Sequence, residues 1–130
     1  MINVGIVEDE EQIRESLAIL INGSEGFSCA YAFETAEEAI IAIPTLNLDV
    51  VLMDIHLPYE DGYGAMRKIR QEDTLKNIPI VAVTADTGVQ QLHNAQLAGF
   101  NGFIGKPLNP DRFPDQVKRI LTGSPVWEYN

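Results

Sequence analysis

The sequence contains a single cysteine, Cys29, among its 130 residues. One cysteine cannot form a disulfide within the chain or supply the several thiolates of a cysteine-based zinc site. Disulfide-stabilised domains and cysteine-rich metal domains are therefore excluded. We interpret Cys29 as a small buried residue of a cytosolic protein, because free cysteine is among the most buried residue types.

Positive charge is also scarce. The chain has 9 Lys and Arg residues against 19 Asp and Glu residues, which gives a formal net charge of −10. A surface of this sign repels the phosphates of nucleic acids and the headgroups of anionic lipids. We therefore expect no direct binding to nucleic acid.

Long apolar runs are missing as well. No run approaches the roughly 20 residues that a helix needs to span a bilayer. The first residues, Met1-Ile2-Asn3-Val4, lack the basic start of a secretory signal. The sequence predicts a cytoplasmic protein that does not insert into a membrane.

The chain does contain a regular alternation of short apolar runs and longer segments of helical period. This alternation is typical of βα units around a parallel sheet, and 45% hydrophobic residues over this length fit one core. We predict the α/β class, with one domain over residues 1–123 and a tail at 124–130. Strands are expected at 2–7, 28–33, 49–53, 80–83 and 102–105, and helices at 10–21, from 35 onward, 62–70, 90–98 and about 112–121.

Two helix boundaries carry specific signals. Thr35-Ala36-Glu37-Glu38 is a capping box that opens a helix, and Pro44 should end or bend that helix. For the last helix we expect Asp111 as the N-cap and Pro114 at the third position, where its missing N–H costs little.

Polar residues follow the apolar runs of the expected sheet: Glu8 and Asp9 after the first, Asp54 after the third, Thr84 at the end of the fourth and Lys106 after the fifth. Ligands of open parallel sheets bind outside the carboxyl ends of the strands. Three carboxylates gathered there repel one another unless a hard cation joins them. Mg²⁺ prefers one or two carboxylates together with a phosphate oxygen, so the pattern indicates a phosphoryl-transfer site.

Each of these residues has a simpler interpretation when it is taken alone. The acidic pair could cap the first helix, Asp54 could be a turn residue before Pro58, Thr84 could end a strand or cap a helix, and Lys106 could be solvated. None of these interpretations predicts that all five fall at the same edge of the sheet. We therefore take them together as one candidate site.

From about Val4 to about Leu121, the chain resembles the receiver domains of response regulators in two-component systems. Among these it is most similar to the single-domain regulators of the chemotaxis-regulator type. The resemblance rests on Ile6-Val7-Glu8-Asp9-Glu10, on Leu52-Met53-Asp54-Ile55-His56-Leu57-Pro58 with Asp61-Gly62, on Val83-Thr84-Ala85 and on Lys106-Pro107. It implies a five-stranded parallel sheet of flavodoxin-like order 2-1-3-4-5 with helices on both faces. That strand order is a property of the family and is not deduced from these residues.

The resemblance also implies a phosphorelay chemistry. Asp54 would accept a phosphoryl group from a phosphohistidine of a sensor histidine kinase or of a histidine phosphotransfer protein. Mg²⁺ would be held directly by Asp9 and Asp54, through water by Glu8, and by the backbone carbonyl of His56. Lys106 would pair with the phosphoryl group.

Thr84 and Phe103 are the residues that the resemblance assigns to the switch. Thr84 would turn to a phosphoryl oxygen, and Phe103 would turn inward into the vacated space. No output domain follows in the sequence, so we expect a downstream protein target to bind the fourth and fifth βα units. The domain would not be a conventional turnover enzyme, but it would catalyse its own phosphorylation and dephosphorylation.

Two other functions are alternatives to this phospho-switch. A phosphorelay shuttle would receive the group at Asp54 and pass it to another histidine, and the sequence barely separates this role from the switch. A flavin carrier of the same fold is disfavoured, because Glu8-Asp9-Glu10-Glu11 lies where a phosphate-cradling loop would be needed.

The residues that border the site and the C-terminal tail allow more than one interpretation. His56 and Asp86, two residues after Asp54 and Thr84, border the phosphoryl group in this family and leave its lifetime open. We interpret the His56 imidazole as a packing or solvent-facing group. In the tail, Trp127 and Tyr129 could dock on a partner, pack on the domain or be disordered.

Overall fold

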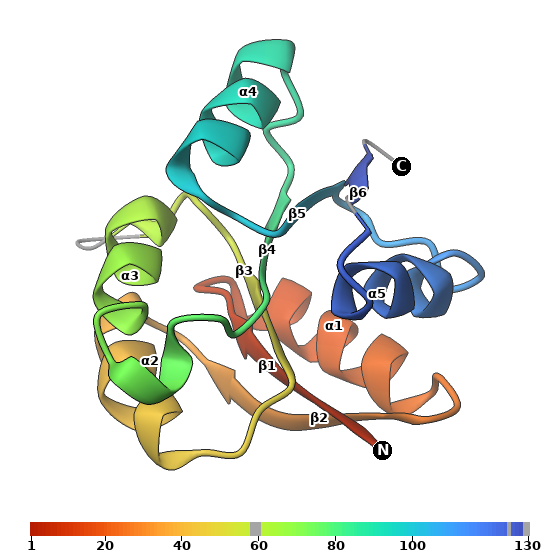
Figure 1. The fold of residues 1–130 in the computed structure, drawn as a ribbon. Helices are drawn as coiled ribbons and strands as arrows, with labels where there is room; N and C mark the ends of the chain where they lie inside the picture. The colour runs from red at the N-terminus through yellow and green to blue at the C-terminus, as the bar shows by residue number, and fades with distance from the viewer. Residues whose placement is uncertain (58–60, 125, 129–130) are drawn as a thin grey trace.

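A parallel β-sheet with helices on both faces forms the core of the molecule (Figure 1). The computed structural model describes residues 1–57, 61–124 and 126–128. Pro58 and Tyr129, which entered the sequence interpretation, lie outside these ranges. The strands are β1 (Ile2–Val7), β2 (Phe27–Phe33), β3 (Val50–Met53), β4 (Ile80–Thr84), β5 (Gly102–Gly105) and β6 (Val126–Glu128). The helices are α1 (Glu11–Asn22), α2 (Ala36–Ala42), α3 (Gly62–Ile69), α4 (Val89–Ala98) and α5 (Phe113–Leu121), with short 3₁₀ turns at Ile43–Thr45 and Asp73–Leu75.

The strand order is β2-β1-β3-β4-β5-β6, with every neighbouring pair parallel. The expected order 2-1-3-4-5 is thereby confirmed. All four residues of β3, Val50–Met53, are buried, as expected for a central strand that is covered on both faces. In the register, Val7 lies level with Met53, Met53 with Ala82, and Thr84 with Gly105. The strands therefore end at a common edge.

Two apolar layers flank the sheet. On one face, buried residues of α1 and α5 such as Leu17 and Phe113 pack against Val4 and Leu52. On the other face, α2, α3 and α4 pack against residues that include Met53 and Phe103, through small side chains such as Ala95. Among the residues that the structure describes, no helix is long and apolar enough to cross a bilayer.

The sixth strand comes from the segment that the sequence interpretation placed after the domain. Residues Val126–Glu128 pair with β5 in parallel, with Val126 opposite Gly102 and Trp127 opposite Phe103. Val126 is only 1% exposed and belongs to the apolar layer that α1 and α5 form. Of the alternatives considered for the tail, the described part packs on the domain itself.

Several local predictions are confirmed. The Thr35 side chain accepts a hydrogen bond from the Glu38 N–H at 3.1 Å, which caps α2. Helix α2 ends at Ala42, and Pro44 lies in the 3₁₀ turn that follows, where its missing N–H breaks no α-helical bond. Gly99 closes α4 with a φ of 101°, a conformation that glycine adopts without a steric penalty.

Two local predictions are wrong. The N-cap of α5 is Arg112 rather than Asp111, so Pro114 occupies the second helical position. The reason is a turn that precedes the helix, in which the Asn109 side chain accepts the Asp111 N–H and the Asn109 carbonyl accepts the N–H groups of Arg112 and Phe113. Cys29 is only partly buried, because β2 is an edge strand of the sheet.

Candidate functional site

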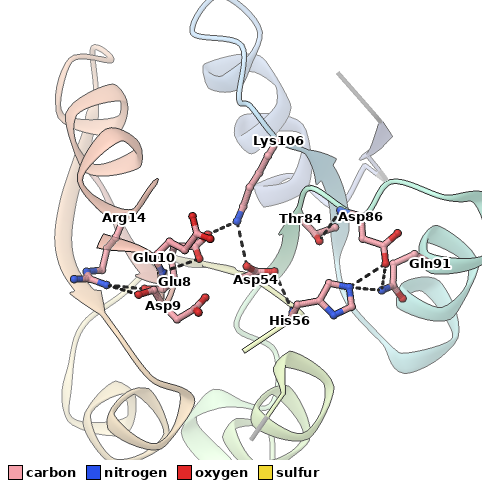
Figure 2. A network of polar contacts seen from close by, with 10 residues as sticks. All are labelled: Glu8, Asp9, Glu10, Arg14, Asp54, His56, Thr84, Asp86, Gln91 and Lys106. Atoms are coloured by element: carbon pink, nitrogen blue, oxygen red, sulfur yellow. Dashed lines mark hydrogen bonds and ion pairs between the residues drawn. The ribbon is translucent and has the colours of Figure 1, made fainter. Parts of the chain in front are cut away.

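The five polar residues singled out in the sequence meet at the carboxyl edge of the sheet (Figure 2). They come from four separate βα connections: Glu8 and Asp9 after β1, Asp54 after β3, Thr84 at the end of β4 and Lys106 after β5. A cavity of about 200 Å³ is bordered by all five. The simpler interpretations of the single residues do not account for this convergence.

Lys106 occupies the centre of the cluster. Its ammonium group forms ion pairs with Glu8 and with Asp54, whose Oδ2 atom lies 3.1 Å from Nζ. The side chain of Lys106 is only 10% exposed, so the interpretation of Lys106 as a solvated residue is wrong. The Lys106 N–H also donates to the Thr84 carbonyl at 2.9 Å, which ties the β5–α5 connection to the end of β4.

Glu8 is the most deeply buried acid of the site, with 1% of its surface exposed. Burial, together with the nearby charge of Asp54, raises the pKa of Glu8 to about 7 against the opposing effect of Lys106. Burial acts to lower the pKa of Lys106, but the hydrogen bond to Glu8 and the carboxylate charges outweigh it and raise that pKa. Lys106 therefore stays charged at neutral pH, and the carboxyl groups of Glu8 and Asp54 share this one cation.

Glu8, Asp9 and Asp54 can present one carboxylate oxygen each within 4.8 Å of one another. This spacing, the oxygen-only chemistry and the excess of negative charge over the single ammonium fit a hard divalent cation such as Mg²⁺. Glu8 and Asp9 do not cap α1 with their side chains, because its N-cap is Glu10 and no side chain caps it.

Arg14, which the sequence interpretation did not include, stabilises the loop that carries the acidic pair. Its guanidinium donates to the backbone carbonyls of Glu8 and Asp9 at 2.9 and 3.3 Å. These bonds are drawn at the left of Figure 2. The sequence did offer one signal for Arg14, which is a cation in the first turn of the helix after the acidic pair. Only the fold shows that Arg14 contacts the loop backbone rather than a carboxylate.

The position of Asp54 is set by backbone contacts. The Asp54 N–H donates to the Val7 carbonyl at 3.0 Å, and the Asp54 Oδ1 atom accepts the His56 N–H at 3.0 Å. Gly62, the first residue of α3, lies so close that an added Cβ would be 2.6 Å from the Asp54 carbonyl oxygen. Only glycine fits this approach without moving the loop that carries Asp54.

The two expected switch residues are both buried. Thr84 is 1% exposed, and its hydroxyl oxygen accepts the Asp86 N–H at 3.1 Å within its own loop. Phe103 is fully buried in the layer that α2, α3 and α4 cover, and it lies level with Ala82 of β4. In this arrangement the Thr84 hydroxyl is engaged locally and not with Asp54.

His56 and Asp86 form a contact across the mouth of the cavity. The His56 Nε2 atom lies 3.0 Å from Asp86 Oδ2 and 3.1 Å from Gln91 Nε2, and Gln91 accepts a hydrogen bond from Tyr63 at 2.7 Å. The hydrogen bond from His56 lowers the pKa of Asp86. The His56 imidazole faces solvent, with 59% of the side chain exposed, but it also joins the β3–α3 and β4–α4 connections. The sequence contained no signal for Gln91 or Tyr63.

Comparison with known proteins identifies this arrangement. The family model described as the response regulator receiver domain matches residues 4–118. The chain belongs to the response regulator receiver family. A receiver domain is a module of two-component signalling, and the five-residue site is assembled from the motifs that carried the resemblance in the sequence.

Individual relatives agree with this assignment. The receiver is 37% identical over 86% of its length to part of the CAI-1 autoinducer sensor kinase/phosphatase CqsS of Vibrio cholerae, of which the match covers 16%. It is 30% identical to the chemotaxis protein CheY of Pseudomonas aeruginosa over 66% of this chain and 72% of that protein. The crystal structure of a two-component response regulator of the LuxR family from Aurantimonas superposes with a TM-score of 0.86 at 28% identity, covering 95% of this chain and 87% of that one.

Proposed function

We propose that this receiver accepts a phosphoryl group on Asp54 from a phosphohistidine of a partner sensor kinase or histidine phosphotransfer protein in the cytoplasm. The observation that carries the proposal is the ion pair between Lys106 and Asp54 beside two further carboxylates. In the transfer, an Asp54 carboxylate oxygen attacks phosphorus, the phosphorus–nitrogen bond of the phosphohistidine breaks, and an acyl phosphate and a free imidazole result. The leaving nitrogen keeps the electron pair of the broken bond, and the proton on the other ring nitrogen makes the departing imidazole neutral.

The chain supplies an acceptor carboxylate, Asp54, and a cation for the charge of the transferred phosphoryl group, Lys106. Asp54 Oδ1 accepts the His56 N–H, whereas Oδ2 faces the Lys106 ammonium. The ammonium can therefore follow the incoming phosphoryl oxygens and neutralise their charge in a largely buried site. The cavity of about 200 Å³ leaves room for the phosphoryl group in front of Asp54.

Glu8, Asp9 and Asp54, together with the His56 carbonyl, would hold Mg²⁺. When bound, this ion supplies positive charge to the transferring oxygens and relieves the repulsion between the carboxylates. Arg14 contributes by fixing the backbone of the loop from which Glu8 and Asp9 project.

An apolar groove next to Lys106 supports the approach of a protein donor. It has a volume of about 490 Å³ and lies between α1 and the β5–α5 connection, with Ile13, Leu17 and Leu20 on one side and Pro107 and Leu108 on the other. A phosphohistidine donor has to bring its imidazole to Asp54, and this groove offers a hydrophobic contact surface beside that position.

Phosphorylation would act through Thr84 and Phe103. For the Thr84 hydroxyl to reach a phosphoryl oxygen, it must leave the Asp86 N–H; Phe103 lies on the neighbouring strand, two residues before the position opposite Thr84. The favourable contacts exist only when the phosphoryl group is present, so the population shifts between two conformations. A downstream protein would bind the surface of the fourth and fifth βα units in one of them.

A phosphorelay shuttle is the second candidate function. It is favoured by the similarity to part of a protein named as a sensor kinase/phosphatase. The two roles differ in reverse transfer. A shuttle returns the phosphoryl group readily to a histidine phosphotransfer protein, whereas a switch retains it until hydrolysis.

The proposal is tested by intact-mass spectrometry after incubation with Mg²⁺ and acetyl phosphate. The wild type should gain one phosphoryl group, and Asp54→Asn should gain none. Asp73→Asn, which removes an exposed carboxylate far from the site, is the matched control and should be phosphorylated like the wild type. A wild type that stays unmodified under conditions that preserve acyl phosphates would overturn the proposal.

A further inference from the structure

Strand β6 covers the edge of β5, the strand that carries Phe103 (Figure 1). Without β6, the backbone N–H and C=O groups along this side of β5 would have no strand partner. A sheet edge of this kind is a template for pairing with another chain. The segment Val126–Glu128 therefore occupies a position at which a partner could otherwise bind.

The contacts of β6 alternate between the two faces of the sheet. Val126 packs into the layer of α1 and α5, and Trp127 packs against the opposite layer, which contains Phe103. Trp127 is also the register partner of Phe103. The position of Trp127 thus depends on the packing of the residue that we assign to the switch.

Glu128 attaches the end of β6 to α5. Its two carboxylate oxygens contact Arg112 at 2.9 Å and Arg119 at 3.3 Å, and Gln116 donates to it at 2.8 Å. The Gln116 hydrogen bond and the two arginine charges lower the pKa of Glu128. These ion pairs are partly exposed, so each of them contributes little to stability.

The strand is short, with three residues, and lies at the edge of the sheet. Few hydrogen bonds hold a strand of this length, and such elements open at a small fraction of the free energy that global unfolding requires. Gly102 brings β6 close to β5, since an added Cβ there would lie 3.1 Å from the Val126 carbonyl oxygen. A small displacement of β5 at this position would therefore also displace β6.

We propose that β6 is a releasable cover of the β5 edge, which phosphorylation at Asp54 loosens through Phe103 and Trp127. This inference rests on the proposed function. When Phe103 turns toward the space that Thr84 vacates, Trp127 loses part of its packing, and the weak ion pairs of Glu128 do not hold the strand alone. The backbone groups along this edge of β5 then lose their strand partner.

Trp127 is the one tryptophan among the 130 residues, so its fluorescence reports on β6 in the intact 130-residue chain. On incubation with acetyl phosphate and Mg²⁺, the emission should move to longer wavelength as the indole becomes hydrated. Amide hydrogen exchange over residues 102–105 and 126–128 should become at least about tenfold faster. Intact mass measured on the same sample gives the fraction phosphorylated, and Asp54→Asn should show neither change.

Two variants test the cover independently of phosphorylation. Glu128→Gln removes the charge that Arg112 and Arg119 contact, so its emission and exchange should already lie between the two wild-type states without a phosphodonor. Glu25→Gln, an exposed glutamate in the turn before β2, should match the wild type. Full phosphorylation with unchanged emission and unchanged exchange would overturn the inference, whereas a chain that takes up no phosphoryl group would overturn the proposed function instead.

Discussion

The Lys106 ammonium lies 3.1 Å from the Asp54 carboxylate and simultaneously contacts Glu8, although 98 residues separate Lys106 from Glu8 in the sequence. The buried Lys106 ammonium, which follows β5, thus joins the acidic groups that follow β1 and β3. Removing Lys106 would leave the carboxyl groups of Glu8 and Asp54 without their cation in a buried site. The cluster is therefore both the proposed chemical centre of the domain and a determinant of its stability.

Lys106→Met should destabilise the metal-free domain. Glu8 and Asp54 would face each other without a cation, in a site where their side chains are 2% and 11% exposed. The expected loss is about 3 kcal/mol in the free energy of unfolding, measured by urea denaturation with a chelator present. Excess Mg²⁺ should stabilise this variant more than it stabilises the wild type.

The control for this substitution is Lys76→Met, which breaks an exposed pair with Asp73. It should change the free energy of unfolding by less than about 1 kcal/mol. Equal losses in the two lysine variants would contradict a buried, charge-coupled role for Lys106.

The stability of the metal-free domain should fall as the pH rises through neutrality. The pKa of Glu8 is about 7 in the folded protein, above its ordinary value of 4.5, so the folded state binds this proton more tightly than the unfolded state does. The stability that protonated Glu8 contributes is fully present below about pH 4.5 and is lost as the pH rises through about 7. The loss should be on the order of 2 kcal/mol.

Glu8→Gln should flatten this part of the pH profile, because the amide does not titrate. Denaturation curves at about pH 5 and about pH 8.5, both without divalent cations, provide the comparison. Glu25→Gln should retain the wild-type profile. A Glu8→Gln profile as steep as that of the wild type would show that another group is responsible.

His56→Ala should shorten the lifetime of the acyl phosphate several-fold. The contact of the imidazole with Asp86 and Gln91 joins two connections across the mouth of the cavity, and its loss opens the site to water. The lifetime can be followed by intact mass after the phosphodonor is removed. His93→Ala, which truncates an exposed histidine on α4, should leave the lifetime unchanged. A lifetime that stays the same or lengthens in His56→Ala would refute the proposed shielding.

Gly62→Ala should distort the loop that carries Asp54. The added methyl group would lie 2.6 Å from the Asp54 carbonyl oxygen and 2.7 Å from the Ile55 Cα, and both are backbone atoms that cannot rotate away. We expect a loss of about 2 kcal/mol in the free energy of unfolding and slower uptake of the phosphoryl group. Thermal unfolding and the rate of mass gain with acetyl phosphate measure the two effects.

Gly88→Ala provides the matched substitution in another loop. The nearest atom to an added Cβ there is the Asp86 Oδ1 at 3.9 Å, an ordinary contact distance. This variant should lose less than about 1 kcal/mol, mainly through the weaker N-cap of α4. If both glycine variants behaved alike, the close approach at Gly62 would not be the cause.

The residues of the candidate site could be found in the sequence because each one lies at the end of an apolar run. Parallel strands that are linked by helices all run in one direction, so their carboxyl ends share an edge whatever the details of packing. Asp54 and Thr84 were therefore placed together by local patterns alone. The same local physics accounts for Thr35 as a helix cap and for the end of α2 before Pro44.

Other features depend on packing between distant segments. Residues 126–128 have no strand signal of their own, and they become β6 because the β5 edge, the apolar layer below Val126 and the arginines of α5 are already in place. Arg14 has carbonyls to bind only once the β1–α1 loop has turned toward it.

The sequence by itself determined the α/β class, the direction of the strands and the set of charged groups at their carboxyl ends. These depend on periodicity and on the chemistry of single residues. Only the tertiary structure decided that Lys106 ion-pairs with Glu8 and Asp54, that His56 reaches Asp86, and that Trp127 lies opposite Phe103. Side-chain reach and strand register between segments far apart in the chain determine these contacts, and no local pattern specifies them.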